Sequence, residues 1–331
     1  MSAGPRVSVL TPVYNGERDL RECIESVLAQ TYANWDYTIV NNGSTDRTLE
    51  IAREYAARDP RIKVHDNETF VRVIENHNIA FRLISPQSKY CKVVAADDWL
   101  FPECIEKMVG LAETNPRIAV VGAYGLAGKT VIWAGLPYEE RVISGRELCR
   151  SALLGARYVF GTPTAVLFRA DIVRSRHAFY NESNLHADAE AYFEFLENSD
   201  FGFVHQVLTF SREDEGSLTS YSQRFNTYMS GHLYVLKVYG PKYLSGEEVE
   251  RMRSVRLREY YDYLGWQVFK KRGREFWKFH RAKLAELGLP LSVLRLAAAT
   301  AGYVLEIVLN PKRTLERGLR RFRGGPASSA D

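Results

Sequence analysis

Residues 7–46 read VSVLTPVYNGERDLRECIESVLAQTYANWDYTIVNNGSTD, and this stretch decides the fold. It opens with Val7–Leu10, a β-rich apolar run that Pro12 should end, so we expect a short buried strand leading into a loop. A helix should follow, because the next apolar residues are spaced to share one helical face. These residues are Leu20, Cys23, Ile24, Val27 and Leu28.

A second strand and helix follow in the same stretch. Tyr37–Val40 is the strand, Asn42-Gly43 breaks it, and the residues that follow can cap a helix over Thr48–Ala57. The alternation continues with strands at Ile62–Val64 and Tyr90–Ala95 and a helix at Val73–Ile84. Strands that alternate with helices predict an α/β fold with a parallel sheet.

The pattern changes further along the chain. Short strands at Ala165–Phe168 and Phe203–Leu208 mix with a helix at Asp188–Glu197, and after Gln223 the pattern is almost wholly helical. We therefore expect an α/β domain over residues 1–230 and a helical region over residues 231–331.

The composition is that of a folded protein, since 46% of the 331 residues are hydrophobic and 25% are charged. The net charge of +4 hides an asymmetry. Residues 1–250 carry 26 basic and 33 acidic side chains, whereas residues 251–331 carry 18 and 7. This asymmetry indicates a C-terminal part that meets a polyanion or a membrane surface. The four cysteines lack the close spacing of a zinc site or a disulfide framework, so we expect buried thiols.

Polar side chains follow two of the predicted strands. Asn41-Asn42 come after the second strand, and Asp97-Asp98 come after Tyr90–Ala95. Ligands of open α/β sheets bind outside the carboxyl ends of the strands, so these residues could face one ligand. Adjacent carboxylates can hold a sugar hydroxyl and a hard cation such as Mg²⁺ or Mn²⁺, which commonly bridges to substrate phosphates. Taken alone, the two pairs could equally be a plain turn and a solvated cap.

Four motifs precede or include this acidic pair: SVLTPVYNG at 8–16, CIESVLAQTY at 23–32, NGSTD at 42–46 and ADDW at 96–99. As an ordered set they closely resemble the family 2 glycosyltransferases, and the resemblance covers about residues 5–220. It implies the GT-A type nucleotide-diphospho-sugar transferase fold with a mostly parallel central sheet, to which the C-terminal helices are an extension.

The resemblance implies a nucleotide-sugar site formed by Thr11, Pro12, Tyr14, Asn42 and Asp97. The first three would line the base and ribose, with the Tyr14 ring available for stacking. Asn42 stands where many relatives place an Asp that faces the base. Because an amide both donates and accepts, Asn42 fits more bases than uracil. Asp97 would contact the ribose or the donor sugar, and Asp98 would hold the Mn²⁺ or Mg²⁺ ion that bridges the two phosphates.

A downstream pair of segments, GTPTAVLFR at 161–169 and HADAE at 186–190, resembles the acceptor-side half of the same family. There an acidic residue opens a helix and acts as the general base, and Asp188 keeps that position. Its usual acidic neighbour is Ala187 here, and Glu190 is the second candidate for the base. A carboxylate at a helix N-terminus is also a common cap, so a structural role for Asp188 stays open.

The segment SREDEGSLT at 211–219 resembles the end of the catalytic domain, where many relatives have Arg-x-His. Asp214 stands in the place of that His. Its carboxylate could be a second protein ligand for Mg²⁺ or Mn²⁺, and the alternative is a solvated acidic loop.

The C-terminal region carries 11 basic and 3 acidic side chains within residues 251–283, interleaved with eight aromatic rings. This mixture fits a membrane interface and equally a helical pair packed on the catalytic domain. Residues 291–309 are strongly apolar, but their longest uncharged core has ten residues, Leu296–Leu305, whereas a spanning helix needs about 20.

We therefore expect residues 291–309 to form an amphipathic helix that lies on a membrane or packs on protein. Its small or polar stripe is Ser292, Arg295, Ala299, Gly302 and Glu306, and its apolar face is Leu294, Ala298, Ala301 and Leu305. Beyond Pro311 the chain carries Lys312, Arg313, Arg317, Arg320, Arg321 and Arg323. Such a basic cluster beside an apolar helix favours an anionic leaflet.

Together these features predict an inverting, metal-dependent glycosyltransferase that moves a sugar from a nucleotide-diphospho-sugar to a glycan or lipid-linked acceptor hydroxyl in surface polysaccharide or glycolipid assembly. The alternatives are a non-catalytic nucleotide-sugar-binding or scaffold protein and an enzyme that activates sugar phosphates. The lack of a Gly-rich, Lys-containing loop near Pro12 counts against the last. We expect no nucleic-acid partner, because no recognised motif for one occurs. The first apolar run is too short for a signal peptide, so we expect a cytoplasmic protein, peripheral on the inner face of the membrane.

Overall fold

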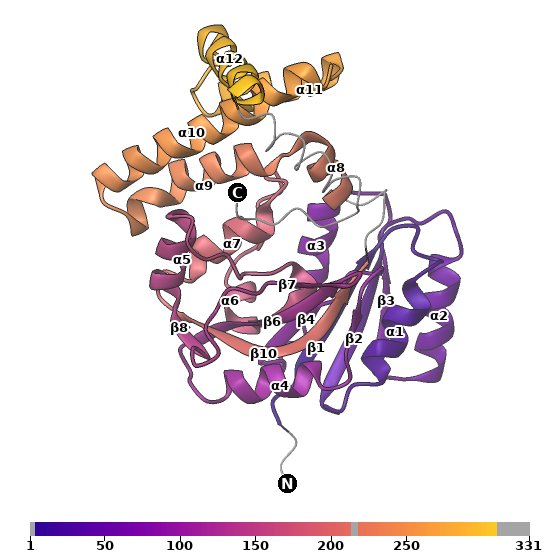
Figure 1. Cartoon of the computed structure of the whole chain (residues 1–331). Helices are drawn as coiled ribbons and strands as arrows, with labels where there is room; N and C mark the ends of the chain where they lie inside the picture. Colours follow the sequence, from indigo (N-terminus) through magenta and orange to yellow (C-terminus); the bar gives the residue numbers. More distant parts are fainter. Residues whose placement is uncertain (1–3, 213–217, 310–331) are drawn as a thin grey trace. The chain divides into compact units, whose positions relative to one another are not determined.

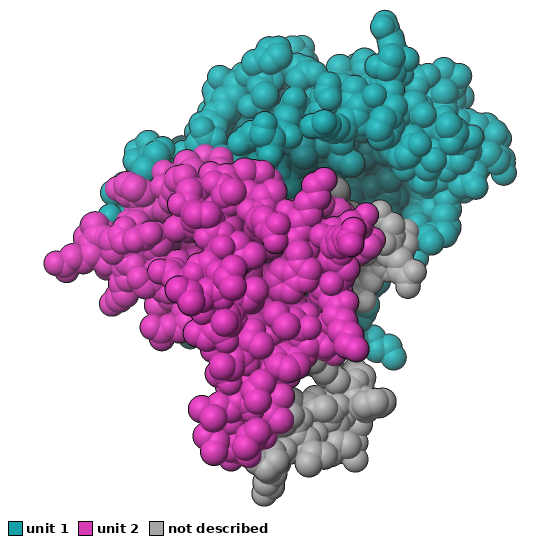
Figure 2. Space-filling view, turned by 90° about the horizontal axis from the view of Figure 1, so that it is seen from above, with its two compact units in different colours: residues 1–220, 242–244 teal, residues 221–241, 245–331 magenta. Residues whose placement is uncertain are grey.

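The computed structural model describes residues 4–212 and 218–309. The chain divides into two compact units, coloured separately in Figure 2. Unit 1 comprises residues 1–220 and 242–244, and unit 2 comprises residues 221–241 and 245–331. Unit 1 is an α/β domain, and unit 2 is helical (Figure 1).

Unit 1 is organised around one ten-stranded sheet whose main path has the order β3-β2-β1-β4-β9-β6-β10-β5, with β7 beside β6 and β8 beside β10. The strands are β1 (Val7–Val13), β2 (Trp35–Asn41), β3 (Ile62–Asp66), β4 (Tyr90–Val93), β5 (Trp99–Leu100), β6 (Ile118–Ala127), β7 (Thr130–Ile132), β8 (Val142–Ser144), β9 (Val166–Arg169) and β10 (Asp200–Ser211).

The connections between these strands supply the helices of unit 1. They are α1 (Leu20–Leu28), α2 (Thr48–Arg58), α3 (Val73–Arg82), α4 (Cys104–Ala112), α5 (Gly145–Leu153), the 3₁₀ turn η1 (Pro163–Ala165), α6 (Ala170–Arg174) and α7 (Ala187–Phe195). The predicted alternation of strands and helices over residues 7–95 is confirmed, and α1 contains the five apolar residues that predicted a helix here. The predicted α/β class is also confirmed.

The first strand is longer than predicted, because Pro12 does not end it. The carbonyl of Val13 accepts the N–H of Asn42 on the β2 side, and the carbonyl of Leu10 accepts the N–H of Val94 on the β4 side. Pro12 therefore faces the β4 side, where pairing has already ended at Leu10. A proline there removes no hydrogen bond from the ladder, so the strand continues to Val13.

The sheet is mostly parallel along its main path, as expected, and it also contains antiparallel strands. Strands β3, β2, β1 and β4 are parallel to one another, but β9 is antiparallel to both β4 and β6. Beyond it, β10 is parallel to β6 and antiparallel to β5 and β8. Antiparallel neighbours need no crossover helix, which is why the strict alternation that predicts parallel pairing is lost after β4.

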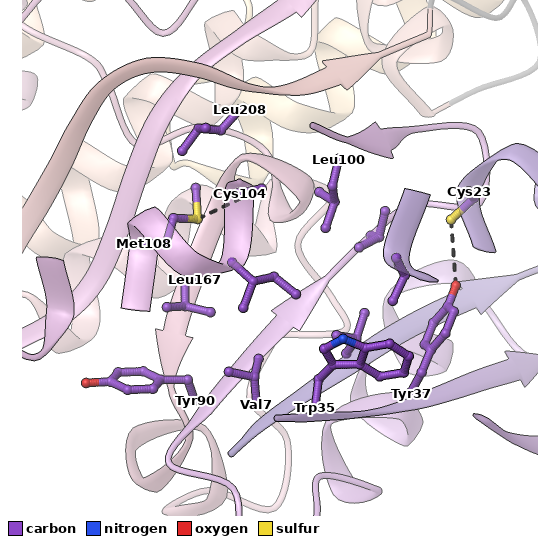
Figure 3. Close-up of a cluster of buried hydrophobic side chains, with 14 of the residues drawn as sticks. Val7, Cys23, Trp35, Tyr37, Tyr90, Leu100, Cys104, Met108, Leu167 and Leu208 are labelled. Atoms are coloured by element: carbon purple, nitrogen blue, oxygen red, sulfur yellow. Dashed lines mark hydrogen bonds between the residues drawn. The ribbon is translucent and has the colours of Figure 1, made fainter. Parts of the chain in front are cut away.

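The main core lies on one face of the sheet. Side chains from α1, α2 and α4 pack there against β1, β2 and β4 (Figure 3). The chain reverses direction across the sheet after β3, since β4 lies on the far side of β1. The carboxyl ends of β1 and β4 therefore form the switch point at which open α/β sheets bind ligands. All four cysteines are buried as free thiols, as predicted.

Unit 2 has a core of its own, formed by rings and leucines of its helices. The helices from its beginning onward are α8 (Leu218–Phe225), α9 (Tyr228–Tyr243), α10 (Gly246–Phe269), α11 (Arg274–Glu286) and α12 (Val293–Leu309). Three of the aromatic residues that the sequence singled out, Tyr260, Tyr261 and Phe276, are buried in this core. Within the described residues, no helix is long and apolar enough to cross a membrane.

Candidate active site

The loop after β1 is locked to the loop after β2 by polar side chains of the sequence motifs. The Asn15 carboxamide accepts the N–H of Thr45 at 2.8 Å, and the Asn15 N–H donates to the Ser44 hydroxyl at 2.9 Å. Asn15 has a φ of 50°, a left-handed backbone that Asn tolerates better than most residues. These motif residues are thus occupied in holding the rim of the sheet.

A second set of bonds fixes the start of α2 against the same loop. The Asp46 carboxylate accepts the N–H groups of Glu17 and Thr48, both at 3.0 Å. The Thr48 hydroxyl in turn accepts the N–H of Gly16 at 2.8 Å. Asp46 thus accepts a backbone N–H at the start of α2 and one in the loop after β1, and so joins the two loops.

Two aromatic rings stand at this rim. Tyr14, directly after β1, is 48% exposed, and Phe70, between β3 and α3, is 58% exposed. Their ring centroids lie 4.7 Å apart with an interplanar angle of 62°. Exposed rings at the carboxyl ends of the strands offer faces on which a nucleobase can stack.

Asn42 holds the segment that carries Phe70. Its carbonyl oxygen accepts the N–H of Val71 at 3.0 Å, and its amide nitrogen donates to the carbonyl of Val71 at 2.9 Å. The Asn67 amide donates to the same Asn42 oxygen at 3.0 Å. Asn42 is 1% exposed, so in this structure its amide is directed at the loop. Direct contact of Asn42 with a base stays a prediction.

Thr11 and Pro12 are both buried, unlike Tyr14. The Thr11 hydroxyl donates to the carbonyl of Val94 at 2.9 Å and lies 2.8 Å from the hydroxyl of Tyr37. Successive strand residues point to opposite faces, and α1 covers the face that Thr11 shares with Cys23. The hydroxyl of Thr11 therefore lies in the core, and contact of Thr11 and Pro12 with a nucleotide stays a prediction.

Asp98 is the buried carboxylate at the end of β4. Its oxygens accept the N–H of Arg212 at 3.1 Å and the hydroxyl of Ser211 at 3.4 Å, and the side chain of Thr164 also hydrogen-bonds it. Burial, and then the neighbouring charge of Asp97, raise the pKa of Asp98 to about 7. A cation beside this pair would favour the ionised form that burial opposes.

Arg212 connects this acidic pair to α1. Its guanidinium donates to the carbonyl of Asp97 at 3.3 Å and to Glu22 at 2.6 Å. It also lies 5.4 Å from the centre of the Trp99 ring. The end of β10 is thereby fixed against the Asp97-Asp98 turn, just before Asp214, which lies outside the described residues.

The described residues place two adjacent carboxylates, Asp97 and Asp98, at this turn. Within residues 4–212 and 218–309, no three His, Cys, Asp or Glu side chains gather as a metal cluster. Mg²⁺ is commonly held by one or two carboxylates together with substrate phosphates and water, so the Asp97-Asp98 pair fits such an ion without a third protein ligand.

Asp188 lies at the start of α7 and is half-buried. Burial raises the pKa of its carboxyl above the usual value, although the helix N–H of Ala189 and the nearby His186 oppose the rise. Glu190 is buried and accepts the amides of Asn181 and Asn184 at 3.0 and 2.7 Å. Of the two candidate bases, Glu190 thus holds a loop, whereas Asp188 has the greater exposure.

The structure brings the loops of the predicted site together. A Cβ on Gly16 would lie 3.5 Å from the Cβ of Ala96, so the Tyr14 loop adjoins the Asp97-Asp98 turn. Thr164 of η1 accepts the N–H of Ala95 at 3.0 Å. The start of this segment is held from α7, because the Tyr192 hydroxyl donates to the carbonyl of Gly161 at 3.2 Å. Residues 161–164 are therefore bonded both to α7, the helix that carries Asp188, and to Asp98.

Sequence reasoning missed Phe70, Thr164 and Arg212 as residues of this site. Thr164 and Arg212 lie within the segments that resemble the acceptor-side half and the end of the domain, which is a signal that could have found them. Phe70 has only a weak signal, namely an aromatic ring that follows three polar residues in a loop.

The ligand-binding edge of this sheet carries two exposed rings and an Asp pair of which Asp98 is buried, an arrangement that fits an α/β nucleotide-sugar transferase of the GT-A type. The crystal structure of TarS residues 1–349 from S. aureus in complex with UDP-GlcNAc shares this fold, with a TM-score of 0.64 and 18% identity over 89% of this chain and 87% of TarS. The mannosyltransferase PcManGT of Pyrobaculum calidifontis, solved with GDP-Man and Mn²⁺, has a TM-score of 0.56 at 14% identity over 95% of this chain and 84% of its own.

The chain belongs to glycosyl transferase family 2, whose family model matches residues 8–175, just over half of its length. EpsE of Bacillus subtilis (strain 168), which is named as a glycosyltransferase, is 30% identical over 72% of this chain and 89% of EpsE. YibD of Escherichia coli (strain K12), named as an uncharacterized glycosyltransferase, is 28% identical over 60% of this chain and 58% of YibD. The chain is accordingly a glycosyltransferase.

Proposed function

We propose that this glycosyltransferase moves a sugar from a nucleotide-diphospho-sugar to a hydroxyl of a glycan or lipid-linked acceptor, with inversion at the anomeric carbon and with bound Mn²⁺ or Mg²⁺. The reaction would serve surface polysaccharide or glycolipid assembly. TarS has been solved with UDP-GlcNAc and with UDP, and PcManGT with GDP-Man and Mn²⁺. These ligands support a nucleotide-sugar donor and a divalent ion. Because they include both uridine and guanosine nucleotides, they do not identify the nucleobase of the donor.

The observation that carries the proposal is the position of Asp98. It is a carboxylate only 7% exposed that lies beside a second carboxylate at the switch point of the sheet. A buried carboxylate beside a second, partly exposed one is costly unless a cation or hydrogen bonds compensate its charge. The Tyr14 and Phe70 rings stand at the same edge and offer the stacking surface that a nucleoside needs.

The metal would be held by Asp98, with Asp97 beside it. When bound, such an ion neutralises the negative charge that develops on the leaving nucleoside diphosphate. The chain itself would orient the donor: Tyr14 and Phe70 by contact with the base, and Asp97 by contact with the ribose or sugar. Asp214 is the second protein ligand that the sequence predicts, and it stays a prediction.

Asp188 is the base in this proposal. Its carboxylate takes the proton of the acceptor hydroxyl while the acceptor oxygen forms a bond to the anomeric carbon from the face opposite the diphosphate. The bond from that carbon to the phosphate oxygen breaks, and the nucleoside diphosphate leaves with the electron pair. The raised pKa of Asp188 favours this role, since a base works best when its pKa approaches the working pH.

The test is thermal stabilisation by UDP-, GDP-, dTDP- and CMP-sugars, each with and without Mn²⁺ or Mg²⁺, on the wild-type protein and Asp98→Ala. The proposal expects a metal-dependent rise in Tm with one donor class that the variant loses. If a donor raises Tm equally with and without Mn²⁺ or Mg²⁺, donor binding does not need the metal ion. No rise with any donor, together with no transfer or donor hydrolysis, would contradict the proposed donor site.

A further inference from the structure

The surface in question is the outer face of α12. Six large apolar side chains on it are strongly exposed: Val293 (75%), Leu294 (83%), Val304 (42%), Leu305 (59%), Val308 (66%) and Leu309 (67%). Ala297, Ala298 and Ala301 lie between them and are exposed too. At 100° per residue these positions cover a continuous arc of the helix that carries no charge. Such a contiguous apolar face on a folded protein marks an interaction site.

The opposite side of α12 is fixed to α10, so the helix cannot turn its apolar face inward. The backbone of Ala299 and Thr300 approaches Gly265 so closely that a Cβ on Gly265 would lie 2.9 Å from it. The rings of Phe269 and Tyr303 are 5.4 Å apart, and the Tyr261 hydroxyl accepts the N–H of Ser292 at 2.8 Å. Leu296 packs on the core of unit 2 from the same side.

The sequence predicted the apolar face of this helix, and the structure shows that this is the face left uncovered. Of the predicted small or polar stripe, Ala299 makes the close contact with α10. Arg295 lies at the border between the two faces, with its guanidinium 6.0 Å from the centre of the Tyr261 ring. Protein thus covers the part of the second face formed by Leu296, Ala299 and Thr300, while Arg295 and Gly302 are exposed.

The charge of unit 2 distinguishes two possible partners of the apolar face, a second copy of the chain and a lipid surface. On α11 the exposed side chains of Arg274, Lys278 and Arg281 recur at helical spacing, and none of the three has an ion pair within the described residues. With Arg272 and Trp277 they line a pocket of about 660 Å³. The sequence adds six cations directly after α12, between residues 312 and 323. Two copies of so cationic a region would repel each other, whereas an anionic lipid surface would attract it.

We propose that the outer face of α12 inserts into the headgroup and acyl boundary of an anionic lipid leaflet, so that unit 2 docks the enzyme on a membrane without crossing it. The apolar arc supplies the insertion, as in helices that lie in the plane of an interface. The cations of α11 supply the preference for anionic lipid. This inference goes beyond the proposed function, because it concerns where the enzyme binds and not which sugar it transfers.

Sedimentation with vesicles tests the proposal on the full chain. The vesicles are phosphatidylcholine alone or phosphatidylcholine with one third phosphatidylglycerol, at low and at high salt. We expect wild-type protein to bind the anionic vesicles and to bind less as salt increases. The Leu294→Ser/Leu305→Ser/Leu309→Ser variant should lose about tenfold or more of its partition coefficient, since it keeps the charge and removes apolar area.

The matched control is Val238→Ser/Val255→Ser, which changes two exposed valines of α9 and α10 in the same unit. It should bind as wild type does. The Arg274→Gln/Lys278→Gln/Arg281→Gln variant should lose binding to anionic vesicles and most of its salt dependence. A separate variant, Leu305→Trp, reports insertion directly, because the indole emission should shift to shorter wavelength when anionic vesicles are added.

Three outcomes would overturn the proposal. The first is wild-type protein that stays in the supernatant with anionic vesicles at low salt. The second is leucine variants that bind as wild type, together with no emission shift for Leu305→Trp. The third is a dimer in light scattering that the leucine variant dissociates, which would assign the face to a second copy. Donor binding is measured separately, so failure here leaves the proposed function untouched.

Discussion

The side chain of Asn42 and the backbone of Val71 are joined in both directions. The Val71 N–H donates to the Asn42 oxygen at 3.0 Å, and the Asn42 amide donates to the Val71 carbonyl at 2.9 Å. The residue before Val71 is Phe70, whose ring contacts that of Tyr14. The sequence predicts that Asn42 faces the base. In the structure its side chain holds the segment that carries Phe70, and it thereby supports the pair of Phe70 and Tyr14 rings.

Asn42→Asp should both destabilise the protein and weaken donor binding. A carboxylate still accepts the Val71 N–H, but it cannot donate to the Val71 carbonyl and places a charge in a buried position. We expect a loss of about 1–3 kcal/mol in the free energy of unfolding, measured by urea denaturation. Phe70→Ala is the comparison: it should leave stability nearly unchanged and weaken nucleotide binding, measured by calorimetry. If both variants bind the nucleotide as tightly as wild type does, the Phe70 ring is not part of the nucleotide site.

Thr164→Val should impair the site through Asp98. Thr164 is 1% exposed, and its side chain hydrogen-bonds Asp98 and accepts the N–H of Ala95. Valine has nearly the same shape as threonine but no hydroxyl, so the N–H of Ala95 would lose its partner. We expect about 1–3 kcal/mol of lost stability, and a lower affinity for metal-bound donor than for nucleotide without metal. Thr164→Ser should restore both properties. If Thr164→Val keeps the wild-type metal dependence, Thr164 does not position Asp98.

Asp188→Asn should retain donor binding and lose transfer. Loss of a general base typically costs about 10²–10⁴-fold in rate, and we expect kcat to fall within that range while the donor Kd is unchanged. The control is Glu190→Gln, which weakens the hold on Asn181 and Asn184 and should lower stability more than kcat. Near-normal turnover by Asp188→Asn would exclude Asp188 as the base.

The raised pKa of Asp188 gives the pH dependence a definite sign. The base must be ionised, so the rate should rise with pH through that raised pKa. Stability should move the other way, because the folded state favours the protonated acid. Its contribution to stability is present below the unfolded pKa of about 3.9 and is lost as pH rises through the folded value. Asp188→Asn should therefore be at least as stable as wild type at neutral pH, which thermal melts would check.

Gly265→Ala should loosen α12. The added methyl would lie 2.9 Å from the backbone of α12, so the two helices must separate or shift, and we expect about 1–3 kcal/mol of lost stability. Hydrogen exchange should increase across residues 293–309. Gly246→Ala is the matched control in the same helix, because nothing lies within 4 Å of its Cβ position, and it should be neutral or stabilising. Unchanged exchange in Gly265→Ala would show that α12 is not held at this point.

The sequence by itself determined the elements and the edge of the sheet where the site lies. Apolar periodicity predicted α1 and its buried face, because burial of one helical face repeats every turn and needs only local information. The strands that precede Asn42 and Asp98 were predicted for the same local reason. Since parallel strands end at one edge, the polar residues that follow them had to lie near one another.

Only the tertiary structure decided what each side chain at that edge does. Thr11 points into the core because α1 covers its face of the sheet, and Asn42 points at residues 67–71 because that loop returns past the end of β2. Arg212 reaches Asp97 across 115 positions of chain, and Thr164 reaches Ala95 across 69. The uncovered face of α12 likewise depends on which side packs on α10. These choices depend on contacts between residues far apart in the chain, and no local pattern records them.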